Sequence, residues 1–124
     1  MGRFVIRKTQ TGFVFCLKAA NGETIATSEV YQTLAGCKKG VCSVVRNAAA
    51  ETLYLDGETP QSVRNPRYEL YQDAAGRYRF RLRAKNGEII AVSEDYLSKS
   101  GCENGIASVR RNAPDARVAV IVSK

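Results

Sequence analysis

The sequence NGETIATSEVY at residues 21–31 returns as NGEIIAVSEDY at residues 86–96, which lie 65 positions later. The match continues without a gap, because residues 36–48 share Gly-Cys, Gly, Ser-Val and Arg-Asn-Ala with residues 101–113. Upstream the offset is 64, so that Phe4 pairs with Tyr68. This self-similarity predicts two copies of one structural unit of about sixty residues.

The first part of each copy has the period of strands. Residues 67–72 and 78–84 alternate apolar and polar side chains, and residues 3–8 and 13–18 are their counterparts in the first copy. Such alternation is typical of strands with one buried face. A third strand is predicted at residues 89–93.

The turn between the second and third strands carries Asn21-Gly22 in one copy and Asn86-Gly87 in the other. Asn-Gly favours a two-residue hairpin of type I′, in which both central residues have positive φ. We therefore predict a tight hairpin of this type in each copy.

The second part of each copy has helical period. The apolar stripes comprise Leu34, Cys37, Val41, Val44, Val45 and Ala48 in the first copy and Cys102, Ile106, Val109 and Ala113 in the second. Thr33 and Ser98 are the predicted N-caps, and Asn47 and Asn112 are predicted to end the helices in the left-handed conformation. Apolar runs at 52–55 and 117–122 follow, so each copy is predicted to be β-β-β-α-β.

These motifs resemble the YegP-like family of small bacterial tandem-repeat proteins of unknown function. Its repeat reads much like Gly-Glu-Ile-Ile, Ser-Glu-x-Tyr and Gly-Ile-x-Ser-Val-x-x-Asn-Ala, and the likeness is strongest over residues 86–113. The first copy departs from it at Val41, Cys42 and Val45, which suggests that the two copies are not functionally equivalent.

The resemblance implies an α+β fold. Two tandem copies would share one antiparallel sheet, with both helices on one face and the C-terminal strands of the copies exchanged. A unit of three strands and one helix is marginal alone, and a shared sheet supplies the missing burial. We expect a single domain over residues 1–124, with repeat 1 at about 2–56, a linker at about 57–65 and repeat 2 at about 66–123.

Composition narrows the classes of function. The chain contains no histidine, which removes the commonest general base and the commonest zinc ligand, so we expect no enzyme, no metal and no cofactor. There is neither a signal-peptide apolar run nor a stretch of about 18 apolar residues, which favours a cytoplasmic protein without membrane contact.

The four cysteines are expected to remain free thiols in a reducing compartment. Cys37 and Cys102 occupy equivalent helix positions and are predicted core residues. Cys42 is predicted to pack like its counterpart Ala107, and Cys16 to be partly exposed.

The repeated motif Ser-Glu-x-Tyr provides the first candidate site: Ser28, Glu29, Tyr31, Ser93, Glu94 and Tyr96. An acid beside a hydroxyl nucleophile would need a third group to orient them, and the sequence offers none. Two interpretations remain open. The motif joins the third strand to the helix through local hydrogen bonds, or it forms a ligand contact that occurs twice.

The second candidate is an arginine-rich strand. The formal net charge is +7, and residues 63–124 carry 12 basic and 7 acidic side chains against 7 and 5 in residues 1–62. Alternation places Tyr78, Phe80 and Leu82 toward the core, and Arg77, Arg79, Arg81 and Arg83 on the outer face with Tyr71. The arginines form either a solvated face or a surface for a phosphate backbone or an acidic protein.

We therefore expect a non-enzymatic small binding or accessory domain, monomeric, with an unknown partner. The alternative is nucleic-acid or polyanion binding through residues 77–83.

Overall fold

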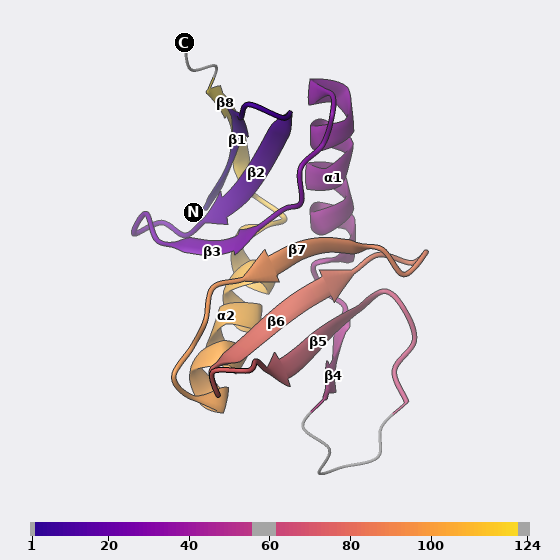
Figure 1. Ribbon diagram of the computed structural model, residues 1–124, viewed down its shortest axis with the longest axis vertical. Coiled ribbons are helices and arrows are strands. Elements are labelled where there is room, and N and C mark those ends of the chain that lie inside the picture. Colours follow the sequence, from indigo (N-terminus) through magenta and orange to yellow (C-terminus); the bar gives the residue numbers. More distant parts are fainter. Residues whose placement is uncertain (1, 56–61, 122–124) are drawn as a thin grey trace.

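The computed structural model describes residues 2–55 and 62–121. The first copy contains β1 (Arg3–Lys8), β2 (Phe13–Lys18), β3 (Thr24–Thr27), α1 (Leu34–Asn47) and β4 (Glu51–Tyr54). The second contains β5 (Arg67–Gln72), β6 (Tyr78–Arg83), β7 (Ile89–Ser93), α2 (Lys99–Asn112) and β8 (Arg117–Ile121). The predicted β-β-β-α-β order is confirmed in both copies (Figure 1). Residues 57–61 of the predicted linker lie outside the described residues, as does residue 56.

One eight-stranded sheet joins the copies in the order β4-β5-β6-β7-β3-β2-β1-β8. The last strand of each copy pairs with the first strand of the other, so the predicted exchange is confirmed. The sheet is mixed, however, because both exchanged strands run parallel to their partners while the five inner pairings are antiparallel. A short hairpin dictates antiparallel pairing, whereas the exchanged strands are reached through longer connections that permit parallel pairing.

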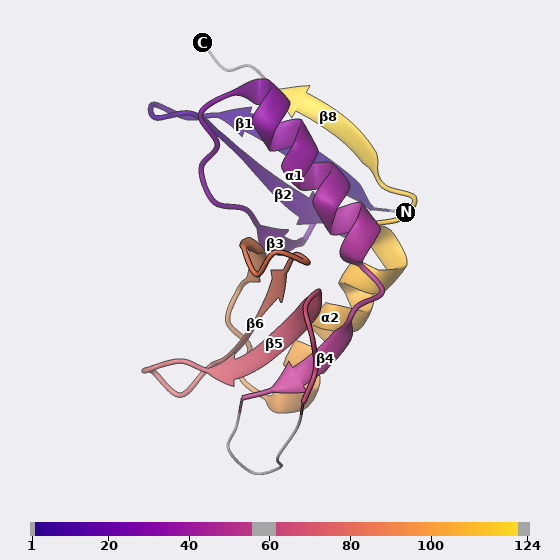
Figure 2. The ribbon, with the colours of Figure 1, turned by 90° about the vertical axis from the view of Figure 1, so that its right-hand side faces the viewer.

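The centre of the sheet is the β3–β7 pair. Thr27 and Val92 hold equivalent positions in the two copies, and they pair with each other. The copies are thus related by an approximate two-fold axis through this pair, and both helices lie on one face of the sheet, as predicted (Figure 2).

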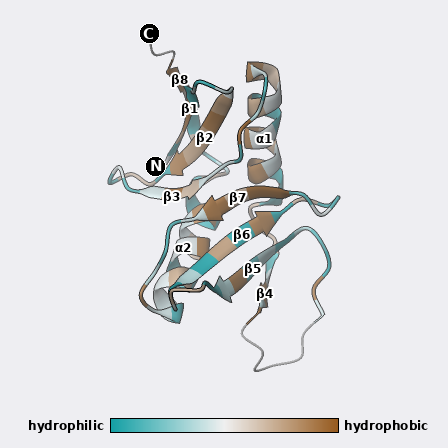
Figure 3. Ribbon diagram, viewed as in Figure 1, coloured by the Kyte–Doolittle hydropathy of each residue, from teal (hydrophilic) through white to brown (hydrophobic). Residues whose placement is uncertain are grey.

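The core lies between this face and the helices. Each helix contacts strands of both copies, since α1 packs on β2 and β7, and α2 packs on β3, β5 and β6. The alternation of hydrophilic and hydrophobic residues along β6 is visible in Figure 3. Neither helix of the described chain has the length and apolar character that a membrane crossing requires.

The helix stripes differ between the copies. All four predicted stripe residues of α2 are buried, as are Cys37, Val41, Val44 and Ala48 in the first copy. Val45 was predicted to be a core residue, but it is 37% exposed, and Cys42 is exposed as well. Both predictions are wrong because this side of α1 turns toward the sheet edge formed by β8.

The hairpin turns also differ from the prediction. Gly22 and Gly87 have positive φ, whereas no described residue other than glycine does, so neither turn is of type I′. The amide of Ala19 donates to the Glu23 carbonyl at 2.9 Å, and that of Gly22 donates to the Ala19 carbonyl at 2.9 Å. This is the longer hairpin loop that closes with a glycine bulge.

The helix starts are confirmed and the ends are not. Thr33 Oγ1 accepts a hydrogen bond from the Gly36 amide at 2.9 Å, and Ser98 does the same for Gly101. Asn47 and Asn112 remain helical, so the predicted left-handed ends are wrong. Their side-chain amides donate back to carbonyl oxygens four residues earlier, at 2.9 Å in both copies, which satisfies those acceptors without a left-handed residue.

A glycine in each helix allows a tyrosine ring to lie on the helix backbone. A Cβ at Gly105 would overlap the Tyr96 hydroxyl and would lie 2.9 Å from Cε2 of Phe80. We expect Gly105→Ala to destabilise the protein by about 1–3 kcal/mol, although the same change in an open helix stabilises by about 0.5–1 kcal/mol. Urea unfolding measures the difference.

Gly101→Ala is the matched control on the same helix. Its Cβ would meet Ser98 Oγ at 3.1 Å and the Tyr96 ring only at 3.6 Å. Its unfolding midpoint should equal or exceed that of the wild type, and equal midpoints for the two variants would contradict the packing argument.

Candidate functional site

The arginine-rich strand lies on the outer face of the sheet, as predicted, and it surrounds a buried acid. The Glu69 side chain is only 2% exposed. It accepts hydrogen bonds from Arg81 Nε at 2.5 Å, Arg83 Nε at 2.9 Å and Arg67 Nη2 at 2.6 Å. Burial alone would raise the pKa of Glu69, but the three arginines outweigh it and lower this pKa to about 2.

The remaining arginines of the predicted set are also paired. Arg79 Nε lies 2.8 Å from Asp73 Oδ2, and Arg77 Nη1 lies 3.2 Å from Asp95 Oδ2. The Arg81 guanidinium lies 4.7 Å from the centroid of the Tyr71 ring, so Tyr71 shares this face as predicted. A phosphate would have to compete with carboxylates for these guanidinium groups. Binding through this strand stays a prediction.

The first copy has no counterpart of this cluster. Val5 occupies the position of Glu69 and is buried, and it pairs with Cys16 where Glu69 pairs with Arg81. The ion pairs therefore stabilise one half of the outer face, while apolar contacts stabilise the other.

The Ser-Glu-x-Tyr motifs divide into structural and surface residues. Ser28 Oγ accepts from the Phe15 amide at 2.9 Å and donates to its neighbouring carbonyl at 2.7 Å, and Ser93 makes the same two bonds with Phe80 and Glu94. These serines hold the end of the third strand. Glu29 and Glu94 are exposed.

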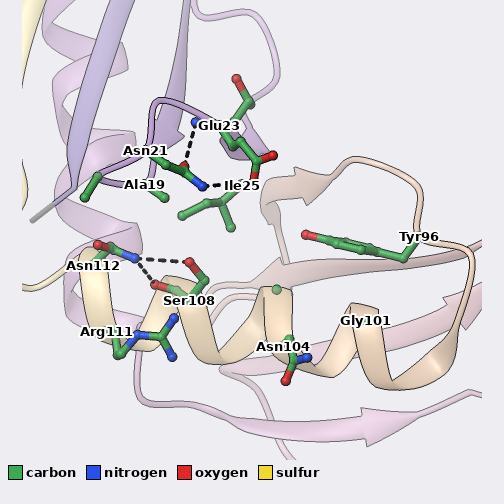
Figure 4. Close-up of a pocket in the computed structure, with 13 residues that line it drawn as sticks. Ala19, Asn21, Glu23, Ile25, Tyr96, Gly101, Asn104, Ser108, Arg111 and Asn112 are labelled. Atoms are coloured by element: carbon green, nitrogen blue, oxygen red, sulfur yellow. Dashed lines mark hydrogen bonds between the residues drawn. The ribbon is translucent and has the colours of Figure 1, made fainter.

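The tyrosines of the motif stand at the edge of a hollow. Tyr31 and Tyr96 are half-buried, and their rings stack on Phe15 and Phe80 with centroids 6.1 and 6.4 Å apart. Neither hydroxyl makes a hydrogen bond to another described residue. In Figure 4 the Tyr96 hydroxyl points toward the side of the hollow where Ile25 lies.

This first hollow lies between the copies and has a volume of about 590 Å³. The β2–β3 hairpin of the first copy contributes Glu23 and Ile25, and α2 of the second copy contributes Ser108 and Arg111 (Figure 4). Glu23 is held by the Asn21 side chain at 3.2 Å. Arg111 makes no ion pair or hydrogen bond within the part of the chain that the structure describes.

The two-fold axis repeats the same arrangement on the other side of the molecule. There the β6–β7 hairpin and α1 form two adjoining depressions, one lined by Ser43 and Arg46 and the other by Tyr31, Glu88 and Ile90. Glu88 is held by Asn86 at 3.1 Å, and Arg46, like its counterpart, has no partner among the described residues.

The electrostatics of each hollow are dipolar. Glu23 and Arg111 both line the first hollow without pairing with each other, whereas on the other side Glu88 and Arg46 line the two separate depressions. Burial raises the pKa of Tyr96, and the nearby Cys102, Glu94 and Glu23 raise it further. The pKa of Tyr31 is raised in the same way, by burial and by Cys37, Glu88 and Glu29. Both hydroxyls therefore stay protonated at neutral pH and act as hydrogen-bond donors.

The comparisons with known proteins agree with the repeat. Residues 9–54 and 73–119 each match the domain of unknown function DUF1508, which together is more than half of the chain. The chain belongs to the DUF1508 family. The YegP protein of Yersinia pestis, a UPF0339 protein, is 38% identical over 113 residues, which cover 90% of this chain and 88% of the relative.

Other relatives match the whole fold or a single copy. The solution structure of Escherichia coli YegP, a protein of unknown function, matches with a TM-score of 0.81 at 35% identity and covers 99% of this chain and 95% of its own. A UPF0339 protein of Shewanella oneidensis matches with a TM-score of 0.79 at 30% identity, over 98% and 92% of the two chains. A UPF0339 protein of Methanosarcina acetivorans is 58% identical over 55 residues, which are 44% of this chain and 95% of that relative. That relative therefore has the length of one copy.

The hollows of this DUF1508 protein involve residues that sequence reasoning missed. Glu23, Arg46, Glu88 and Arg111 were seen only as parts of the repeat. The available signal was that these polar side chains are identical in both copies although nothing in the core requires them. Their juxtaposition was hidden because each hollow combines the hairpin of one copy with the helix of the other.

The cysteines have no partners for metal chemistry. No group of three or more Cys, Asp or Glu side chains within residues 2–55 and 62–121 could hold a metal ion. Cys37 and Cys102 are buried as predicted, and burial raises the pKa of both thiols, that of Cys102 to about 12. Cys16 is half-buried, in agreement with the prediction.

Proposed function

We propose that the protein is a non-enzymatic binding domain whose two related hollows each take a small zwitterionic ligand, such as a free amino acid or a short peptide. One observation carries this proposal. The same carboxylate, guanidinium and tyrosine hydroxyl line the space between the copies on both sides of the two-fold axis.

The chemistry of the hollow fits a ligand that carries both charges. Arg111 offers paired donors to a carboxylate, and Glu23 offers an acceptor to an ammonium group. The neutral Tyr96 hydroxyl adds a donor, and Ile25 supplies apolar contact. The hollow has the size of ordinary ligand pockets.

Its groups serve binding better than catalysis. The raised pKa of Tyr31 and Tyr96 makes them poor bases, and the chain has no histidine to activate a nucleophile.

An NMR titration of the ¹⁵N-labelled protein tests the proposal. L-Alanine, L-lysine, L-glutamate and the dipeptide Ala-Ala are the probes, and N-acetyl-alanine amide, which lacks both charges, is the control ligand. We expect at least one probe to shift the amides of Ile25, Tyr96 and Ser108 and those of their counterparts, with millimolar affinity. The control ligand should shift neither set.

Matched variants assign the two sites. Arg111→Met should abolish the shifts in the first hollow and leave those in the second, and Arg46→Met should do the reverse. Arg7→Met, an exposed arginine of β1, should change neither set. The absence of shifts with every probe, or identical shifts in Arg111→Met and the wild type, would reject the zwitterion site.

A further inference from the structure

The two edge strands of the sheet, β8 and β4, differ in their contacts with the neighbouring helix. Strand β8 is the outermost strand on its side, and all five of its residues are exposed. A bare strand edge presents unpaired amide and carbonyl groups that can accept another strand. Four of the exposed large hydrophobic side chains of the described chain lie at this edge: Val45, Val118, Val120 and Ile121.

At the equivalent edge, side chains of α2 form hydrogen bonds with β4 and the residue that precedes it. Tyr54 Oη donates to Glu103 Oε2 at 2.6 Å, and Arg110 donates to the Ala50 carbonyl at 2.8 Å and to Thr52 Oγ1 at 3.1 Å. Val45 of α1 stands where α2 has Arg110, and Val120 stands where β4 has Tyr54. The contacts that join β4 to α2 are thus replaced by apolar side chains at the β8 edge.

These replacements leave an open apolar groove between α1 and β8. It has a volume of about 300 Å³ and is lined by Val41, Cys42, Val118, Val120 and Lys38. Figure 2 shows β8, the edge strand of the sheet, beside α1. Cys42, which was predicted to pack like Ala107, lines this groove and is therefore exposed.

The outer side of the same edge is basic. The pairing of β1 with β8 sets Arg3 beside Arg117 and Arg7 beside Ile121, on the face opposite Val118 and Val120. These three arginines are exposed and make no ion pair with another described residue. The three elements at this edge, β1, α1 and β8, contain 7 basic and no acidic residues, whereas β4, β5 and α2 contain 4 basic and 3 acidic ones.

We propose that the β8 edge is a docking site for an extended acidic segment of a partner protein, which adds to β8 as a further strand. Alternate side chains of an added strand point to opposite faces. Apolar side chains on one face would cover Val118 and Val120 in the groove, and acidic side chains on the other would meet Arg3, Arg7 and Arg117. The backbone groups of β8 supply the hydrogen bonds.

A second copy of this chain fits the edge less well. Pairing β8 with itself would bring together two edges that each carry only positive charge, in molecules of net charge +7. An acidic segment would instead be attracted by the positive charges at this edge.

The probe is a fluorescein-labelled peptide of alternating valine and glutamate, about eight residues long so that it spans the strand. Fluorescein caps its N-terminus and its C-terminus is amidated, so it lacks the terminal charges that the hollows would recognise. A peptide of alternating valine and lysine is the charge control. We expect the glutamate peptide alone to bind in an anisotropy titration, and the amides of β8 to exchange more slowly with solvent when it is bound.

Two variants locate the site on the folded protein. Val118→Glu and Arg117→Glu should each weaken binding about tenfold or more, because they oppose the peptide's charge. Thr52→Glu at the equivalent position of β4, and Arg64→Glu at an exposed site elsewhere, should leave affinity within about twofold. Melting temperatures are compared for all four variants. If Val118→Glu unfolds the protein, the test rests on Arg117→Glu, which changes an exposed side chain.

Several outcomes would overturn the proposal. These are no binding of the glutamate peptide, equal binding of the lysine peptide, and unchanged affinity in the folded β8 variants. A single-stranded oligonucleotide that protects the same amides at lower concentration would assign the edge to nucleic acid. A wild-type dimer that Val118→Glu dissociates would assign it to a second copy.

Discussion

Residues 1–62 expressed alone are expected to be unfolded in dilute solution and to fold only as a dimer. In the whole chain β4 pairs with β5 and β1 pairs with β8, so the isolated copy loses both partners of its exchanged strands. It also loses β7 and α2, which complete the core around β3 and α1. Two fragments could restore every pairing in a dimer. The β4 strand of each fragment would pair with β1 of the other, as the last strand of each copy does in the whole chain.

Sedimentation and amide NMR at increasing concentration measure this association. The Methanosarcina acetivorans relative, which has the length of a single copy, provides a comparison, and we expect it to associate in the same way. A fragment with dispersed amide resonances that sediments as a monomer would show that one copy is a sufficient folding unit.

Glu69→Gln is expected to destabilise the protein by about 3–5 kcal/mol, which is typical when one partner of a buried ion pair is removed. The change leaves Arg67, Arg81 and Arg83 directed at a neutral amide on the outer face. Glu29→Gln, which changes an exposed carboxylate, should alter stability by less than about 0.5 kcal/mol. Chemical denaturation at neutral pH gives both values.

A double variant separates charge from packing at the same position. Glu69→Val with Arg81→Cys introduces the pair that the first copy has at Val5 and Cys16. It should recover part of the stability that Glu69→Val alone loses, because it removes one of the unpaired guanidinium groups. If the double variant lost as much stability as Glu69→Val and Arg81→Cys lose together, Glu69 and Arg81 would not be energetically coupled.

The same cluster predicts acid sensitivity. The pKa of Glu69 is about 2 in the folded protein and about 4.3 in an unfolded chain. A lowered pKa means that Glu69 contributes its full stabilisation above the unfolded value, and that this contribution is lost as the pH falls from about 5 to 2. The difference in stability between wild type and Glu69→Gln should therefore shrink over this range. A difference independent of pH would contradict the ion-pair explanation.

Periodicity and repetition were enough to predict the elements of this fold. The alternation along β6 and the stripe of α2 matched the structure because one-sided burial imposes a period on each element. The predictions of type I′ turns and of left-handed Asn47 and Asn112 were wrong, because local propensity does not distinguish between turns that satisfy the same backbone groups. The exchange of the last strands was predicted from the family resemblance and not from any pattern in the residues.

The candidate sites were less accessible. Strand alternation placed the four arginines correctly on the outer face, but it could not reveal that Glu69, on a neighbouring strand, lies beneath them. The repeated Ser-Glu-x-Tyr motif identified Tyr31 and Tyr96, but it did not reveal the helix arginine of the same copy or the hairpin carboxylate of the other copy that lie near each tyrosine.

The sequence by itself determined the repeat, the order of strands and helices, and the face of each element that enters the core. All of these follow from interactions within one copy, where spacing along the chain is a reliable guide to spacing in space. The tertiary structure alone decided the parallel direction of β4 and β8, the neutralisation of the arginine-rich strand, the hollows between the copies and the open β8 edge. Each depends on which segments meet in space, within one copy for the arginine-rich strand and across the two-fold axis for the others. A pattern within one segment carries no information about the partner it will meet.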